Sequence, residues 1–461
     1  ASVKEFHKSS ANTLNPVETV EKEICTFLDN PKTASAEMSY TESHGALAPK
    51  GFAPPRLVTE FDVNNRLTFT SIKAHEYYEQ PLELRAKVKL LADLIRRSSH
   101  VLAYTGAGIS TAAGIDDYAT KAKEASVTSE GRPEVRDWKN ARPTKTHRVM
   151  AALHEARMLH HWVQQNHDSL PQKAGYPQHA LNEIHGSLHD PANPIVPYEG
   201  SLRGDLFQWM QEWQERGDLC LCLGSSLSGF NADSVPATAA ERFRRGDGSG
   251  LVIVNLQQTP YDGEASLRIF AKVDDVMGLL AEELAITHLV HPATHVHEPR
   301  IAEGAWVGKD QIQVPFDEQG NPTNGASTIV WDLREGKHVR LTGGPYAGDI
   351  GRVVDKSTEG HYRLRFEHSI NPTFNIPRRP FSLWLGNWWL SEVSRGFGIV
   401  PGGKAPLVNV EAPQGIDISG PAKSLTKYEA MVKAGLPEGA VRQKMNADKI
   451  PQEAQDCLFI L

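Results

Sequence analysis

The fold is decided by the stretch Val101-Leu-Ala-Tyr-Thr-Gly106-Ala-Gly108-Ile-Ser110-Thr-Ala-Ala-Gly114-Ile-Asp-Asp117-Tyr118. A short apolar strand runs directly into glycines at the point where a helix would begin. Glycines allow the backbone to approach a phosphate closely, and the N–H groups at the start of the next helix attract the anion. The stretch therefore predicts a phosphate cradle, although a Gly-x-Gly turn alone is as often an ordinary strand-to-helix turn.

Four more blocks follow this stretch along the chain. They are Gln165-Asn166-His167-Asp168-Ser169-Leu170, Glu183-Ile184-His185-Gly186, Gly224-Ser225-Ser226-Leu227 and Val252-Ile-Val-Asn255. In this order the blocks resemble the sirtuins, the NAD-consuming protein deacylases. Pro143 and His147 also resemble a helix start of that family. The resemblance covers roughly residues 90–285.

The resemblance implies NAD as the cofactor and assigns a role to each matching residue. It implies NAD binding by Gly106, Ala107, Gly108, Ser110, Asp117, Tyr118, Gln165, Gly224, Ser225, Ser226 and Asn255, and catalysis by His185, Asn166 and Asp168. His185 would be the base that activates a ribose hydroxyl, because histidine titrates near neutral pH. Two alternatives stay open: His185 as an ordinary loop residue, and Asn166 and Asp168 as caps of the following helix.

The sequence departs from the family's pattern in three ways. Between His185 and Gly224 the cysteines are Cys220 and Cys222, which lie in a strand at the wrong spacing for a tetrahedral zinc site. We therefore expect no metal and a shortened small domain. Ala119 stands where the family has an arginine that orders the cofactor loop, and His167 replaces an apolar residue of the nicotinamide pocket.

Composition narrows the class of protein. The 461-residue chain carries a net charge of −7, which argues against a nucleic-acid-binding surface as the main function. No apolar stretch reaches the ~18 residues of a membrane helix, so we expect no membrane span. The four cysteines are scattered, which favours an intracellular, reducing compartment, either cytoplasmic or cytoskeletal and axonemal, with mitochondria as the alternative.

Apolar strands and helical stretches alternate through the middle of the chain. The strands are expected at 101–104, 219–223 and 251–254, and the helices at 86–99, 144–158, 203–216, 236–244 and 274–285. This alternation predicts an α/β fold, with a Rossmann-like parallel sheet covered on both faces. The full expectation adds a reduced small domain, a C-terminal small β-barrel and a helical tail.

The expected domains follow from composition and periodicity. They are an extended polar N-terminal arm (1–85), a sirtuin-like NAD-binding domain (86–290), a linker (291–328), a β-barrel that looks like an SH3 or KOW module (329–395) and a C-terminal tail with a helical hairpin (396–461). Within the arm only residues 17–28 look helical, so an ordered arm needs either its own domain or a partner surface to hold it. Deletion of residues 1–80 is accordingly expected to leave the NAD-binding domain folded.

The C-terminal part suggests contacts with other proteins. Trp384, Trp388 and Trp389 would supply aromatic surface to the barrel, although core and edge packing is the stronger interpretation. The hairpin at 424–448 is similar to a segment in a coiled-coil subunit of the WASH complex. It would dock on a partner or pack on its own chain.

Two functions remain open at this level. The first is an NAD-binding, sirtuin-like enzyme that deacylates a protein lysine or cleaves NAD. The second is a catalytically weak or inactive, sirtuin-like structural subunit of a large assembly, with the arm, the barrel and the hairpin as its protein contacts. The retained His185, Asn166 and Asp168 favour the enzyme, whereas Ala119 and the missing zinc ligands favour the structural subunit.

Overall fold

The computed structural model describes most of the chain. Described are residues 38–61, 64–66, 69–117, 126–134, 140–196, 200–228, 231–323, 327–366, 382–412, 428, 431–432 and 438–447. The expected helix at 17–28, the site residue Tyr118, the substitution at Ala119 and the turn of the C-terminal hairpin lie outside these residues.

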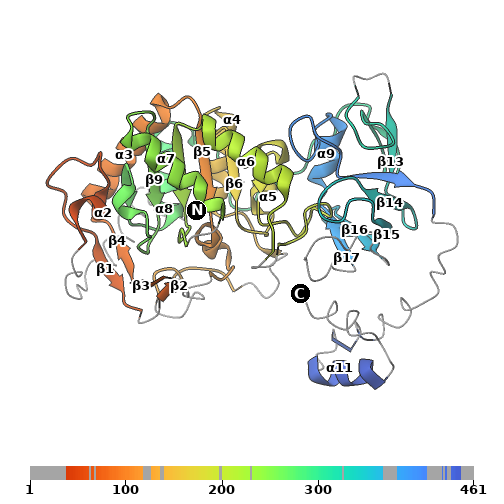
Figure 1. Cartoon of the computed structure of the whole chain (residues 1–461), viewed down its shortest axis with the longest axis horizontal. Coiled ribbons are helices and arrows are strands. Elements are labelled where there is room, and N and C mark those ends of the chain that lie inside the picture. Colours follow the sequence, from red (N-terminus) through yellow and green to blue (C-terminus); the bar gives the residue numbers. More distant parts are fainter. Residues whose placement is uncertain are drawn as a thin grey trace, which may run out of the picture.

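A parallel six-stranded sheet forms the centre of the molecule (Figure 1). Its strand order is β10-β9-β8-β5-β6-β7, so the first and fourth strands along the chain, β5 and β8, lie side by side. The strands are β5 (Val101–Thr105), β6 (His161–Gln164), β7 (Leu181–Glu183), β8 (Leu219–Leu223), β9 (Gly250–Val254) and β10 (Leu267–Ile269). The fold is therefore α/β with a Rossmann-like sheet, and the strand order reverses between β5 and β8.

Helices cover both faces of this sheet. The helices are α3 (Pro81–Arg97), α4 (Lys145–Glu155), α5 (Leu170–Lys173), α6 (Gly204–Arg216), α7 (Ser234–Arg244) and α8 (Val273–Glu283). Alternate strand residues divide between two hydrophobic cores: Ala103 and Leu221 pack with α3, α4 and α8, while Tyr104 and Cys222 pack with α6 and α7. Because both faces are buried, the strands read as continuous apolar runs.

The described part of the N-terminal arm is folded against the edge strand β10, which corrects the expectation of an extended arm. It contains α2 (Tyr40–His44), β1 (Arg56–Thr59), β2 (Asn64–Arg66), β3 (Phe69–Lys73) and β4 (Glu76–Tyr78). The backbone N–H groups of Ala46 and Leu47 donate to the carbonyls of Ala265 and Ser266 at 3.0 and 2.9 Å. At the opposite end of β10, Glu79 N–H donates to the carbonyl of Phe270, which follows the strand, at 2.7 Å. The arm's own chain thus supplies the surface that holds it.

Two antiparallel sheets follow the parallel one. The first is β11 (Trp306–Gly308), β12 (Gln311–Val314) and β13 (Ile329–Asp332), and the second has the order β17-β16-β15-β14-β18. The strands of the second are β14 (His338–Leu341), β15 (Ile350–Lys356), β16 (Tyr362–Phe366), β17 (Ser382–Leu385) and β18 (Leu407–Val410). The expected linker therefore contains two strands, and among the described strands the five-stranded sheet stays open rather than closing into a barrel. Its inner face is apolar, and helix α9 (Trp388–Ser394) buries two of the expected tryptophans.

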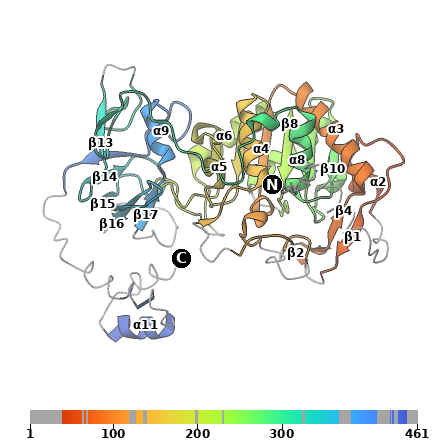
Figure 2. The same ribbon diagram turned by 180° about the vertical axis from the view of Figure 1, so that it is seen from behind.

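Short elements complete the described structure. They are the 3-10 turns η1 (Ala107–Ile109), η2 (Thr111–Ala113), η4 (Gln178–Ala180), η5 (Asn231–Asp233), η6 (Asp262–Glu264) and η7 (Thr287–Leu289), and helix α11 (Glu438–Ala447) of the expected hairpin. In the part of the chain that is described, no helix combines the length and the hydrophobicity needed to cross a membrane. Figure 2 shows the molecule from behind, with α5 and α6 between the parallel sheet and α9.

Candidate functional site

Two glycine turns meet at the carboxyl ends of β5 and β8. The N–H of Gly106 donates to Leu223 O at 3.2 Å, and the N–H of Gly108 donates to Gly224 O at 2.9 Å. A Cβ atom on Gly108 would lie 2.7 Å from Gly224 Cα, and Gly224 itself has a φ of +59°. Only glycines allow the two backbones to come this close. The turns lie where the strand order reverses, which is where open α/β sheets bind their ligands.

The chain after the first turn differs from the expected helix start. Two 3-10 turns, η1 and η2, follow Gly106, and Gly114 ends the second with a φ of +88°. Ser110, between the two turns, is completely buried. A tight turn of this kind keeps the residues after Gly106 close to the strand ends instead of carrying them away along a helix axis.

A polar network joins three of the sequence blocks. Asn166 donates from Nδ2 to Gly106 O and to Ser110 Oγ, both at 3.0 Å. Ser110 Oγ in turn donates to Asp168 Oδ2 at 2.6 Å. Gln165 Nε2 donates to Ser225 Oγ at 3.0 Å, which links the end of β6 to the turn after β8. The residues chosen from these blocks are therefore neighbours in space.

Asp168 also has a structural role. Its second oxygen, Oδ1, accepts the N–H of Leu170, the first residue of α5, at 3.0 Å. Both carboxylate oxygens are thus engaged within the protein, and the side chain is 6% exposed. The bond to Leu170 joins Asp168 to the start of α5, whose N-cap residue is Ser169. Together the bonds of both oxygens fix the orientation of Asp168 beside Asn166.

The turn that carries His185 is tied to the Asn166 block. His167 Nδ1 lies 2.9 Å from Gly186 O, and because a carbonyl can only accept, this nitrogen carries the proton. Burial lowers the pKa of His167, so the ring is neutral at pH 7. Gly186 has a φ of +94°, and a Cβ there would lie 2.3 Å from Pro194 O. His185 itself is half-buried, and its carbonyl accepts the N–H of Val196 at 2.9 Å.

Two buried carboxyl groups lie beside this turn. Burial raises the pKa of Glu183, two residues before His185, to about 8. It also raises the pKa of Asp190 to about 6, although the guanidinium of Arg203 opposes that shift. Glu183 Oε1 has no hydrogen-bond partner among the described residues. Glu183 is therefore protonated at neutral pH, a property that no sequence motif indicated.

A buried arginine, which no sequence motif indicated, fixes the turn after β9. Arg268 Nε lies 2.8 Å from Asp262 Oδ1, with side chains 0% and 4% exposed. The same guanidinium donates to the carbonyls of Asn255 and Gln257 at 2.9 and 2.6 Å. It thereby holds the backbone of the residue assigned to the adenosine ribose. An arginine inside the apolar run 267–271 could have revealed this pair, because a buried charge needs a partner.

The remaining assigned residues lie around the same strand ends. Ala107 and Ser226 are half-buried in the two glycine turns, and Asp117 is half-buried on the loop after Gly114. Asn255 Nδ2 donates to Gln257 O at 3.2 Å, so its side chain faces its own turn. Among the described residues no group of three or more histidines, cysteines and carboxylates is arranged to hold a metal ion.

Comparison with known proteins relates this region to one family. The family model described as "Sir2 family" matches residues 120–193. NAD-dependent protein deacetylase sirtuin-7 of Mus musculus is 32% identical over 257 residues, which cover 46% of this chain and 63% of that protein. NAD-dependent protein deacetylase SRT1 of Arabidopsis thaliana is 28% identical over 248 residues, covering 45% of this chain and 51% of that protein.

The chain was also compared with solved structures. The structure titled "Sir2-p53 peptide-NAD+" is 26% identical, with a TM-score of 0.36, and the match covers 43% of this chain and 99% of that one. The chain spans less than two-thirds of the length of the mouse and Arabidopsis relatives.

Proposed function

We propose that the chain carries a sirtuin-like domain, as its similarity to the Sir2 family suggests, and that it binds NAD and uses it to remove an acyl group from a protein lysine. The observation that carries the proposal is the convergence of four separate sequence blocks at one edge of the sheet. Asn166, Ser110 and Asp168 form one hydrogen-bonded group there, and Gln165 after β6 reaches Ser225 after β8. His167 Nδ1 lies 2.9 Å from Gly186 O and so joins the His185 block to this group.

The residues at this edge fit a dinucleotide. The two glycine turns lie at the switch point between β5 and β8, where no side chain intervenes between the backbones. The hydroxyl groups of Ser225 and Ser226 and the amides of Gln165 and Asn255 are neutral donors and acceptors, which suit ribose hydroxyls. Arg268 holds Asn255 in its turn through the backbone carbonyl.

Bound NAD would supply a glycosidic bond whose cleavage releases nicotinamide and opens the ribose carbon to the acyl oxygen of the substrate. His185 takes a proton from a ribose hydroxyl as general base. Asn166 and Asp168 line the nicotinamide side of the site. His167, neutral and bonded to Gly186 O, keeps the His185 turn against that side.

Further parts of the proposal go beyond the family relationship. The small domain is zinc-free, as the spacing of Cys220 and Cys222 indicates. The C-terminal sheet is an SH3- or KOW-like module, and the terminal hairpin, together with the N-terminal arm, contacts other proteins. The protein acts in an intracellular, reducing compartment.

Nicotinamide release tests the function. We expect the purified protein to release nicotinamide from NAD when an acylated-lysine peptide is present. His185→Ala should lower the rate at which the peptide is deacylated by about 100-fold or more, because a general base contributes at least that much and acts after the nicotinamide bond opens. NAD affinity measured by calorimetry should change little, since the base acts after binding. His288→Ala, at an exposed position in η7, is the matched control.

The outcomes separate the two functions considered from the sequence. If His185→Ala deacylates the peptide as fast as the wild type, His185 is not the base. If the wild type binds NAD but releases no nicotinamide, the protein is an inactive structural subunit. In that case Ala119→Arg should restore some release, because a guanidinium there would order the cofactor loop.

A further inference from the structure

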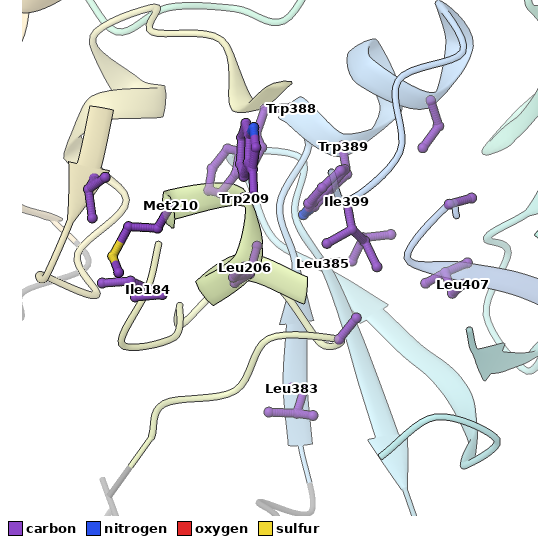
Figure 3. Close-up of a cluster of buried hydrophobic side chains, with 14 of the residues drawn as sticks. Ile184, Leu206, Trp209, Met210, Leu383, Leu385, Trp388, Trp389, Ile399 and Leu407 are labelled. Atoms are coloured by element: carbon purple, nitrogen blue, oxygen red, sulfur yellow. The ribbon is translucent and has the colours of Figure 1, made fainter. Parts of the chain in front are cut away.

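One hydrophobic core is shared between the His185 turn and the C-terminal sheet. Ile184, which directly precedes His185, is fully buried in the same cluster as Trp209 of α6. Trp388 and Trp389 of α9 belong to this cluster as well, and Figure 3 shows members of the cluster from both parts of the molecule, with Ile184 next to Met210. The residue before the proposed base therefore packs into a core that the C-terminal part completes.

Hydrogen bonds cross the same boundary. The N–H of Gly386, at the end of β17, donates to His189 O at 2.8 Å. His189 Nδ1 lies 2.9 Å from the hydroxyl of Ser169, the residue after Asp168. On α9, Glu392 Oε2 lies 2.8 Å from His179 Nδ1, and Glu392 is almost completely buried. His189 thus bonds the Asp168 loop on one side and the C-terminal sheet on the other.

Aromatic rings fill the contact around His189. Its ring centroid lies 4.6 Å from that of His361 and 5.4 Å from that of Trp388. The exposed fractions of these three side chains are 4%, 4% and 7%. Rings packed at these distances resist separation, because water would have to enter an apolar contact.

The loop between β14 and β15 packs closely against the segment 184–193. A Cβ atom on Gly344, between β14 and β15, would lie 1.9 Å from Ala192 O. Gly344 has a φ of +76°, so glycine is favoured there on two grounds. Arg203 Nη1 donates to the same Ala192 carbonyl at 2.7 Å. The segment 184–193 is therefore enclosed along its length by groups of the C-terminal part and of Arg203.

We propose that the five-stranded sheet and α9 form a permanent wall of the site, and that His189 is a positioning residue through which this wall holds the His185 turn. The inference rests on the proposed function for its catalytic consequence. Its structural content, the fixation of residues 184–193 by the C-terminal part, is independent of any turnover.

The test compares His189→Ala with His288→Ala in the full chain. Amide hydrogen exchange should speed up by about tenfold or more at residues 184–193, while the amides of β5 and β8 keep their protection. In an assay of peptide deacylation, kcat should fall by about tenfold or more with the KM for NAD within about twofold, because a displaced base harms chemistry rather than binding. His189→Asn, which can restore the bond to Ser169, should recover part of both losses.

A second variant approaches the contact from the other side. The indole N–H of Trp388 has no hydrogen-bond partner among the described residues, so Trp388→Phe removes packing without breaking a bond. It should speed exchange at residues 184–193 as well, and it decides the matter if His189→Ala does not fold. Trp306→Phe, at a 46% exposed position, is its control.

The two proposals fail separately. If exchange at residues 184–193 and kcat in both variants match their controls, the wall is not a support of the site. If the wild type releases no nicotinamide but exchange rises in the variants, the wall stands and the proposed function fails. If exchange is unchanged while kcat falls, His189 acts in some other way than by positioning the turn, and the inference is overturned.

Discussion

At the scale of single residues, Glu183 makes the stability of the protein depend on pH. Its pKa in the folded chain is about 8, against an ordinary value of 4.5. Between these values the unfolded chain releases the proton and the folded chain keeps it. The free energy of unfolding therefore falls as the pH rises from about 5 to 8, by at most about 1.4 kcal/mol per pH unit from this group.

We expect Glu183→Gln to remove this contribution, because glutamine is neutral at every pH and has nearly the same shape. The variant should lose about 1 kcal/mol less stability per pH unit than the wild type over the same range. Urea denaturation at pH 5, 6, 7 and 8 measures the difference. Parallel stability curves for the two proteins would show that Glu183 is ionised in the folded chain.

Gly108 tests the close approach of the two glycine turns. In Gly108→Ala the new Cβ would lie 2.7 Å from Gly224 Cα, so the turns must separate. We expect NAD affinity to fall by about tenfold or more, because the backbone that faces the phosphates moves. Gly204→Ala is the control, since a Cβ there has nothing within 4 Å. Equal calorimetric affinities in both variants would exclude these turns from the NAD site.

At the scale of elements, the ion pair of Arg268 and Asp262 connects β10 to the turn after β9. Removal of one partner leaves a buried charge, which costs about 3–5 kcal/mol. Arg268→Met should lower the free energy of unfolding by about that amount in urea denaturation. The matched control is Arg334→Met, because Arg334 pairs with Asp332 at the surface and its loss should leave the midpoint unchanged.

The same scale shows how far the sequence predicts the fold. The strands at β5, β8 and β9 and the helices α4, α6, α7 and α8 were predicted to within a few residues, because long apolar runs and helical spacing are local signals. The strands β6, β7 and β10 were missed. Each has only three or four residues, and polar or charged side chains such as His161 and Arg268 interrupt their apolar pattern. Their partners are distant in the chain, so no local pattern reports the pairing.

The features of the site also divide into those that local sequence predicts and those that depend on tertiary contacts. The glycine turns and the Asn166 and His185 blocks could be chosen from the sequence because they are short and contiguous. The bonds that join them, such as Ser110 to Asp168 and His167 to Gly186, depend on how separate strand ends meet. His189 lies outside every block, because its role comes from a sheet nearly two hundred residues further along the chain.

At the scale of the whole molecule, the N-terminal arm protects the edge of the parallel sheet. Residues 46, 47 and 79 form hydrogen bonds with the residues that flank β10, and Glu79 forms a buried ion pair with Lys87 at 2.5 Å. Deletion of residues 1–80 should therefore destabilise the sheet and promote aggregation, contrary to the sequence-based expectation that the domain stays folded. Light scattering during a thermal ramp measures this. A truncated chain that melts and scatters like the full chain would show that the arm is dispensable.

Cys220 and Cys222 lie on β8, next to β5 in the middle of the sheet, and both are completely buried. Burial raises the pKa of the Cys220 thiol to about 12, and that of Cys222 is raised as well, so neither thiolate forms in the folded chain. An alkylating reagent can reach them only after α6 and α7 have separated from the sheet. With Cys25 and Cys457 replaced by serine, the rate of alkylation measures how fast the core around Cys220 and Cys222 opens. A ligand that binds across β5 and β8 would slow the alkylation of these two cysteines, whatever chemistry follows.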